Sequence, residues 1–128
     1  MKKVVAFAAA VALLVSAWLI YSKAAQTRRE AHYREVIAPF QRDLHVGMTR
    51  AEVEKYLDSQ SVKYYVVSFD QGTESNETTY ETKIGEEPGN LVCEPWQVYI
   101  ALEFNSSNTL KEVHIRKIGT CLLIQASK

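Results

Sequence analysis

The chain has 128 residues, and its 15 Lys and Arg residues are balanced by 15 Asp and Glu residues. This length accommodates one small domain and an appendage. The neutral balance argues against nucleic acid as a partner, because a nucleic-acid-binding surface needs a basic surplus on one face.

The first segment, residues 1–22, is predicted to be a membrane anchor. Its 18 residues from Val4 to Tyr21 contain no charge, no Pro and no Gly. As a helix they would rise about 27 Å, close to the roughly 30 Å of a bilayer core. Trp18 and Tyr21 lie at one end of the stretch, where amphipathic rings prefer the interface. We expect a single-pass helix in contact with membrane lipid.

Two other interpretations of this segment stay open. The small residues Ser22 and Ala24 are spaced for signal-peptide cleavage before Ala25, although the apolar stretch exceeds the roughly 7 to 15 residues usual for a signal peptide. The segment could also be a buried helix of a soluble protein. No Cys lies near its end, which excludes anchoring through a lipidated cysteine.

Residues 23–43 are rich in helix formers and predict a helical stalk. Pro39 is expected to end or bend that helix, because it disfavours helical angles at the preceding residue. Residues 44–123 are assigned to one small domain and residues 124–128 to a tail.

The domain begins with a turn and a short amphipathic helix. Gly47 can adopt backbone angles that other residues avoid. Thr49 followed by Glu52 predicts a capping box, and Met48 is placed to contact Val53 across the helix start. The apolar residues Val53, Tyr56 and Leu57 then share one face at helical spacing.

Strand signals fill the rest of the chain. Residues 61–69 and 96–104 are rich in β-branched and aromatic side chains, and 110–119 reads as the partner of the latter. Residues 78–84 alternate weakly and predict an edge strand or a loose ribbon. The fold class is therefore α+β: an N-terminal transmembrane helix, then a short capped helix packed on a three- to four-stranded antiparallel sheet.

The segment from Leu44 to Leu57, with Gly47, Met48 and Thr49 followed by apolar residues at helical spacing, resembles the BamE-like (SmpA/OmlA) family. The resemblance extends over about residues 44–118. It implies two helices on a three-stranded antiparallel sheet, an envelope setting, and binding of other proteins or lipid. This chain lacks the Gly and Pro that close the family's helix and the lipidated Cys that anchors the family. The family's role in assembling outer-membrane barrels is therefore not transferred.

The two cysteines, Cys93 and Cys121, flank the predicted hairpin of 96–104 and 110–119. If Phe104 lies opposite Leu110, the same register places Glu103 opposite Lys111 and the two cysteines opposite each other. A slip by one residue would bring Ile100 beside Val113, and a bulge near Pro95 or Gly119 would reconcile the two registers. We expect a disulfide; two independent buried thiols are the alternative, and no Cys-x-x-Cys pattern supports a catalytic thiol.

A disulfide implies an oxidising compartment, and hence a periplasmic or extracellular domain. The basic residues after the apolar stretch, among them Arg28 and Arg29, would instead place the domain in the cytoplasm by the positive-inside rule. We give the cysteines more weight, because a few flanking charges decide topology unreliably.

No motif for catalysis, metal binding or cofactor binding is recognisable. The three histidines, His32, His45 and His114, share no metal-ligand spacing. Four aromatic residues are candidates for a partner surface: Tyr64, Tyr65, Trp96 and Tyr99. One-sided packing with exposed tyrosines would also explain them. The chain is predicted to be a non-enzymatic, membrane-anchored envelope protein that binds a protein or lipid partner. The alternative is a secreted inhibitor or ligand-binding module released by signal cleavage.

Overall fold

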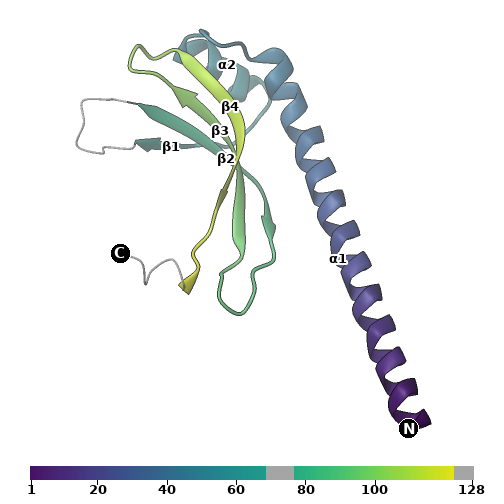
Figure 1. Cartoon of the computed structure of the whole chain (residues 1–128). Helices are drawn as coiled ribbons and strands as arrows, with labels where there is room; N and C mark the ends of the chain where they lie inside the picture. The colour runs from purple at the N-terminus through teal and green to yellow at the C-terminus, as the bar shows by residue number, and fades with distance from the viewer. Residues whose placement is uncertain (69–76, 123–128) are drawn as a thin grey trace. The chain divides into compact units, whose positions relative to one another are not determined.

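The computed structural model describes residues 1–68 and 77–122 and confirms the α+β class (Figure 1). The chain divides into two compact units, Met1–Glu35 and Val36–Lys128. The first unit consists of the N-terminal part of α1, a single helix over Lys2–Asp43. The predicted tail, 124–128, lies outside the described residues.

Helix α1 does not end at Pro39, which lies inside it. The backbone amide of Leu44 still donates to the carbonyl of Phe40 at 2.9 Å. Ile37, Phe40 and Leu44 are all buried in the core of the second unit. Their burial stabilises the last helical turns and outweighs the hydrogen bond that the proline cannot make.

The sheet contains β1 (Tyr65–Ser68), β2 (Thr78–Glu87), β3 (Trp96–Phe104) and β4 (Leu110–Ile118), antiparallel and in that spatial order. Figure 1 shows α2 (Arg50–Ser59) and the end of α1 grouped at one end of the sheet, and the β2–β3 connection at the other end. A hydrophobic cluster joins the helices to one sheet face: Ile37, Phe40, Leu44, Val53, Leu57, Tyr80, Ile100, Leu102, Phe104 and Leu110.

Two expectations about strands are corrected. β2 is an interior strand rather than an edge, because it pairs with both β1 and β3. Its weak alternation arises because Thr79 and Glu81, on the face away from the helices, are buried too. The strand expected over 61–69 begins only at Tyr65, since Ser61 has a φ of 55° and Val62 donates its amide to Leu57 near the end of α2; position 69 lies outside the described residues.

The predicted turn and cap before α2 are confirmed. Gly47 has a φ of 94°. The amide of Glu52 donates to the Thr49 hydroxyl at 3.3 Å, and the amide of Thr49 donates to the Glu52 carboxylate at 2.9 Å. Met48 packs against the same core as Val53. Both orphan amides of the box are therefore satisfied.

The same turn is attached to the start of β4. The amide of Gly47 donates to the carbonyl of Leu110 at 2.8 Å, and the amide of Leu110 donates to the carbonyl of Met48 at 2.8 Å. Arg50 donates its amide to the carbonyl of Asn108 at 3.0 Å. The Gly-Met-Thr turn thus fixes the start of α2 on the β3–β4 hairpin.

Tyr80 of β2 attaches α2 to the sheet by its side chain. Its hydroxyl bonds to Arg50 and Glu54, and the Arg50 guanidinium lies 5.1 Å from the centre of its ring. Burial, and then the hydrogen bond to Glu54, raise the pKa of the Tyr80 hydroxyl. The hydroxyl therefore keeps its proton, donates to the Glu54 carboxylate and accepts from Arg50.

The β3–β4 register differs from both sequence alternatives. Phe104 does lie opposite Leu110, but a bulge follows immediately, so that Glu103 faces Glu112 and Ile100 faces Ile115. The shift runs opposite to the predicted slip. Beyond the far ends of β3 and β4, the register in which Phe104 faces Leu110 returns. There the amide of Glu94 donates to the carbonyl of Thr120 at 2.9 Å, and Cys93 lies opposite Cys121. Inward-facing residues stay inward in this arrangement, because the bulge absorbs the odd residue.

Candidate functional site

One face of the sheet points away from α2 and is called here the open face. Side chains alternate along a strand, and the core takes Tyr80, Ile100 and Leu102. The residues that alternate with these along the four strands therefore form the open face: Tyr65, Val67, Thr79, Glu81, Lys83, Tyr99, Ala101, Glu103, Glu112, His114 and Arg116. Most of these side chains are polar or charged.

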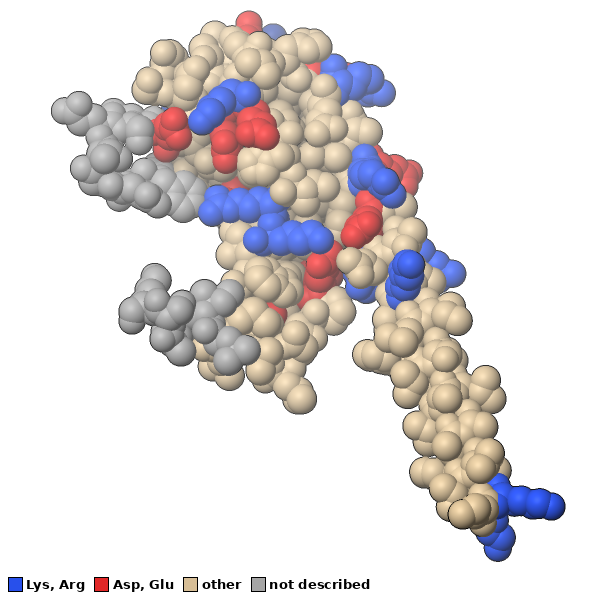
Figure 2. Space-filling model, viewed as in Figure 1, with Lys and Arg blue, Asp and Glu red and all other residues tan. Residues whose placement is uncertain are grey.

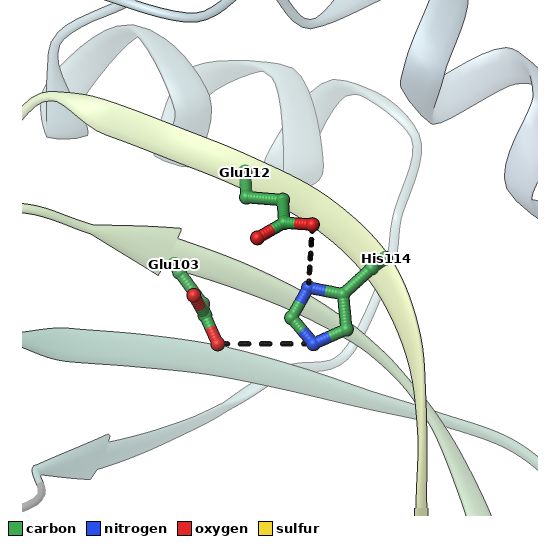
Figure 3. Close-up of side chains that lie close together, drawn as sticks. All are labelled: Glu103, Glu112 and His114. Carbon is green, nitrogen blue, oxygen red and sulfur yellow. Dashed lines mark ion pairs between the residues drawn. The ribbon is translucent and has the colours of Figure 1, made fainter.

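Glu103, Glu112 and His114 lie together on this face (Figure 3). Glu103 on β3 is directly opposite Glu112 on β4, and His114 is the next residue of β4 on the same face. The distance is 3.7 Å from His114 Nε2 to Glu103 Oε1 and 3.9 Å from His114 Nδ1 to Glu112 Oε1. The two ring nitrogens therefore face two different carboxylates.

The residue opposite His114 is Ala101, which is fully buried. Its methyl group leaves room for the imidazole to lean across β3 towards Glu103, a diagonal neighbour that long side chains can reach. About a third of the His114 side chain is exposed, as is about a third of Glu103 and more than half of Glu112. The cluster is thus accessible to small ions from solvent.

Next to this cluster, Arg116 of β4 reaches over β3 to Glu81 of β2. Lys83 pairs with Glu86 at 2.6 Å on the same strand, β2. Figure 2 shows such acidic and basic side chains intermixed on the second unit. The sequence from Val4 to Ser22 contains no charged residue. The open face can therefore bind charged groups, but no single charge sign dominates it.

The four aromatic residues proposed as a partner surface do not form one patch. Tyr64 stacks on Tyr80, with ring centres 4.9 Å apart, and packs against the core. Tyr65 and Tyr99 lie on the open face, with Tyr65 two-thirds exposed and Tyr99 half-buried. Trp96 does not belong to the open face and lies beneath Gly119, where a Cβ would come within 2.6 Å of its ring. Only Tyr65 and Tyr99 remain candidates for a shared surface.

Cys93 and Cys121 form the expected disulfide. It closes the far end of the β3–β4 hairpin, beside an open pocket of about 450 Å³. The pocket is lined by apolar residues, among them Leu91, Val92, Pro95 and Leu122, and by the polar residues Asn90, Glu94 and Thr120. No titratable pair lines it among the described residues, so it offers shape and apolar surface rather than chemistry.

The His114 cluster is the feature that the sequence did not predict. Its members are separated by 2 and 9 positions along the chain, which matches no familiar ligand spacing. Only the register brings them together, and the sequence register placed Glu103 opposite Lys111 instead of Glu112. The bulge next to Phe104 decides which residues of β3 and β4 are paired. A register that included this bulge would have predicted the cluster.

Comparisons with protein-family models, with curated proteins and with solved structures find no match to this chain. What stands is the fold itself: an apolar N-terminal helix and a small disulfide-linked α+β unit.

Proposed function

We propose that the protein is a single-pass, membrane-anchored envelope protein that is not an enzyme, and that its small α+β unit binds a protein or lipid partner. The observation that carries the proposal is the exposure of the apolar stretch of α1. By length and composition α1 can cross a membrane, and every residue of its apolar stretch from Val4 to Tyr21 is exposed. So much exposed apolar surface is unfavourable in water and favourable in a bilayer.

We further propose that the α+β unit faces the periplasm or the exterior. The Cys93–Cys121 disulfide supports this side, because thiols are kept reduced in the cytoplasm. The resemblance of the Gly47–Leu57 region to BamE-like envelope proteins points the same way. The basic residues that follow the apolar stretch favour the opposite side, so the orientation needs a direct test.

Protease protection provides that test. Trypsin added to intact spheroplasts should remove the α+β unit and leave a membrane-bound fragment that contains the apolar part of α1. A cytoplasmic protein of known location, probed in the same sample, should stay intact. Full protection of the α+β unit until the membrane is permeabilised would place it in the cytoplasm.

For partner binding, the open face is the surface to probe. A photo-crosslinking amino acid placed at Tyr65, which is two-thirds exposed there, should capture a partner protein or lipid in native membranes. The same residue placed at Lys55, on the exposed side of α2, serves as the control. Absence of any adduct from Tyr65, or equal adducts from both positions, would contradict binding through the open face.

The Ser22-Lys23-Ala24 sequence supports the secreted alternative. The mass of the mature protein tests it. A mature protein that begins at Ala25 would have lost its anchor and would appear in the soluble fraction. The membrane-anchored proposal requires an intact N-terminal segment in the protein recovered from carbonate-washed membranes.

A further inference from the structure

We propose that Glu103, Glu112 and His114 form a binding site for a divalent metal ion of the zinc class on the open face. One ring nitrogen and one oxygen from each carboxylate would supply three protein ligands. These ligand atoms already lie within 4.8 Å of one another. Atoms that share a tetrahedral ion at about 2.0 to 2.2 Å lie about 3.3 to 3.6 Å apart, so the side chains would rotate to bring both carboxylates to the same ring nitrogen.

The hydrogen-bonding capacity of His114 is the first support. A neutral imidazole has one N–H donor and one lone pair, whereas an ionised carboxylate only accepts. Because the two nitrogens face two carboxylates, a neutral ring must direct its lone pair at one of them. Nδ1 is shielded from solvent and has no hydrogen-bond partner in the described part of the chain. A cation between the ring and a carboxylate removes this mismatch.

The pairing of Glu103 with Glu112 is an independent second support. Like charges directly opposite each other on neighbouring strands are destabilising. Here they occur in register, next to the bulge that creates the pairing. A divalent ion bound by both carboxylates would replace this repulsion with attraction on each side.

The ligand set indicates the class of ion. Imidazole favours zinc and its neighbours in the first transition series over magnesium or calcium, which prefer all-oxygen sites. With three protein ligands and partial exposure, the ion would keep at least one position for water or for a group from a partner. Such a site is open rather than structural, so the fold should not depend on it.

The test is zinc titration of the full-length protein in detergent micelles, followed by calorimetry and by NMR of the histidine ring signals. One zinc per chain should bind, and the ring signals of His114 should shift while those of His32 and His45 stay in place. His114→Gln and Glu112→Gln should each weaken binding by about tenfold or more, since even the loss of a group that only orients a ligand costs about that much. His45→Gln and Glu94→Gln are the matched controls and should bind as the wild type does.

Circular dichroism would show that each variant is folded. Glu112→Gln is the safer variant, because its side chain is mostly exposed. The proposal is overturned if no saturable binding occurs. It is also overturned if zinc binds equally well to His114→Gln, because the ion would then sit elsewhere.

Discussion

Glu81 on β2 and Arg116 on β4 form an ion pair across the intervening strand β3, with 2.9 Å between Oε1 and Nη1. Glu81 is paired in register with Ala101, and Arg116 with Tyr99, so the guanidinium reaches diagonally over β3. The Glu81 side chain is only 8% exposed, whereas Arg116 is 33% exposed. A carboxylate this well buried depends on its partner.

We therefore expect Arg116→Met to lower the free energy of unfolding by about 1 to 3 kcal/mol. The loss should be smaller than the roughly 3 to 5 kcal/mol of a fully buried pair, because Arg116 is partly solvated. Lys111→Met is the control. Its ion pair with Glu77 spans 3.8 Å between half-exposed side chains and should contribute about 0 to 1 kcal/mol. Urea unfolding of the four-stranded unit measures both. Equal effects of the two variants would show that Glu81 does not need Arg116.

The capping box gives a second prediction. Thr49→Ala removes the hydroxyl that accepts from the Glu52 amide and should cost about 1 kcal/mol. Glu52→Gln should cost much less, because Gln can also accept from the Thr49 amide at this position. The midpoints of urea unfolding compare the two variants. A Glu52→Gln variant as unstable as Thr49→Ala would mean that charge, rather than the cap, matters here.

The turn before the cap gives a third prediction. A Cβ added at Gly47 would meet no atom within 4 Å, so the φ of 94° is the main obstacle to a substitution there. Gly47→Val should cost at least about 1 to 2 kcal/mol, whereas Gly47→Asn should cost less, because Asn tolerates positive φ better than β-branched residues do. Thermal melts of the three proteins provide the ranking. An unchanged melting temperature for Gly47→Val would show that the turn relaxes to another conformation.

These three predictions also show what the sequence could and could not provide. The turn at Gly47, the Thr49 cap and the Trp96–Phe104 strand follow from residues adjacent in the chain, and the structure confirms them. Their determinants are local hydrogen bonds and side-chain alternation, which a single sequence records directly.

The side-chain pairs across the sheet depend on strand order and register, which no short stretch of the sequence determines. Glu81–Arg116 and Glu103–Glu112 follow from the strand order and from the bulge beside Phe104. A bulge moves every later pair by one residue, so a small error there replaced Glu112 with Lys111 opposite Glu103. The interior position of β2 was missed for a related reason, because its buried Thr79 and Glu81 resemble the polar residues of an edge.

A fourth prediction concerns the anchor. Replacing both Leu13 and Leu14 with Arg should prevent stable insertion, at a cost of about 2.5 to 3.5 kcal/mol for each charge near mid-helix. The matched control places the same two charges at Gln26 and Thr27, outside the uncharged stretch. Carbonate extraction of membranes should release the first variant and retain the second. Release of the wild type would exclude α1 as an anchor.

The last prediction concerns the Cys93–Cys121 disulfide, whose cysteines are 28 positions apart. Closing a loop of this size should stabilise the fold by about 3 to 4 kcal/mol through the entropy of the unfolded chain. That is a large share of the roughly 5 to 15 kcal/mol typical of a small domain. Cys93→Ser, Cys121→Ser and the double variant should therefore be destabilised to similar extents, because each loses the same bond. Reductant should lower the melting temperature of the wild type and leave that of the double variant unchanged.

Thiol labelling of the denatured, unreduced protein isolated from membranes provides the decisive control. Labelling of both cysteines would show that no disulfide forms in the cell, and the basic residues after the apolar stretch would then favour a cytoplasmic α+β unit.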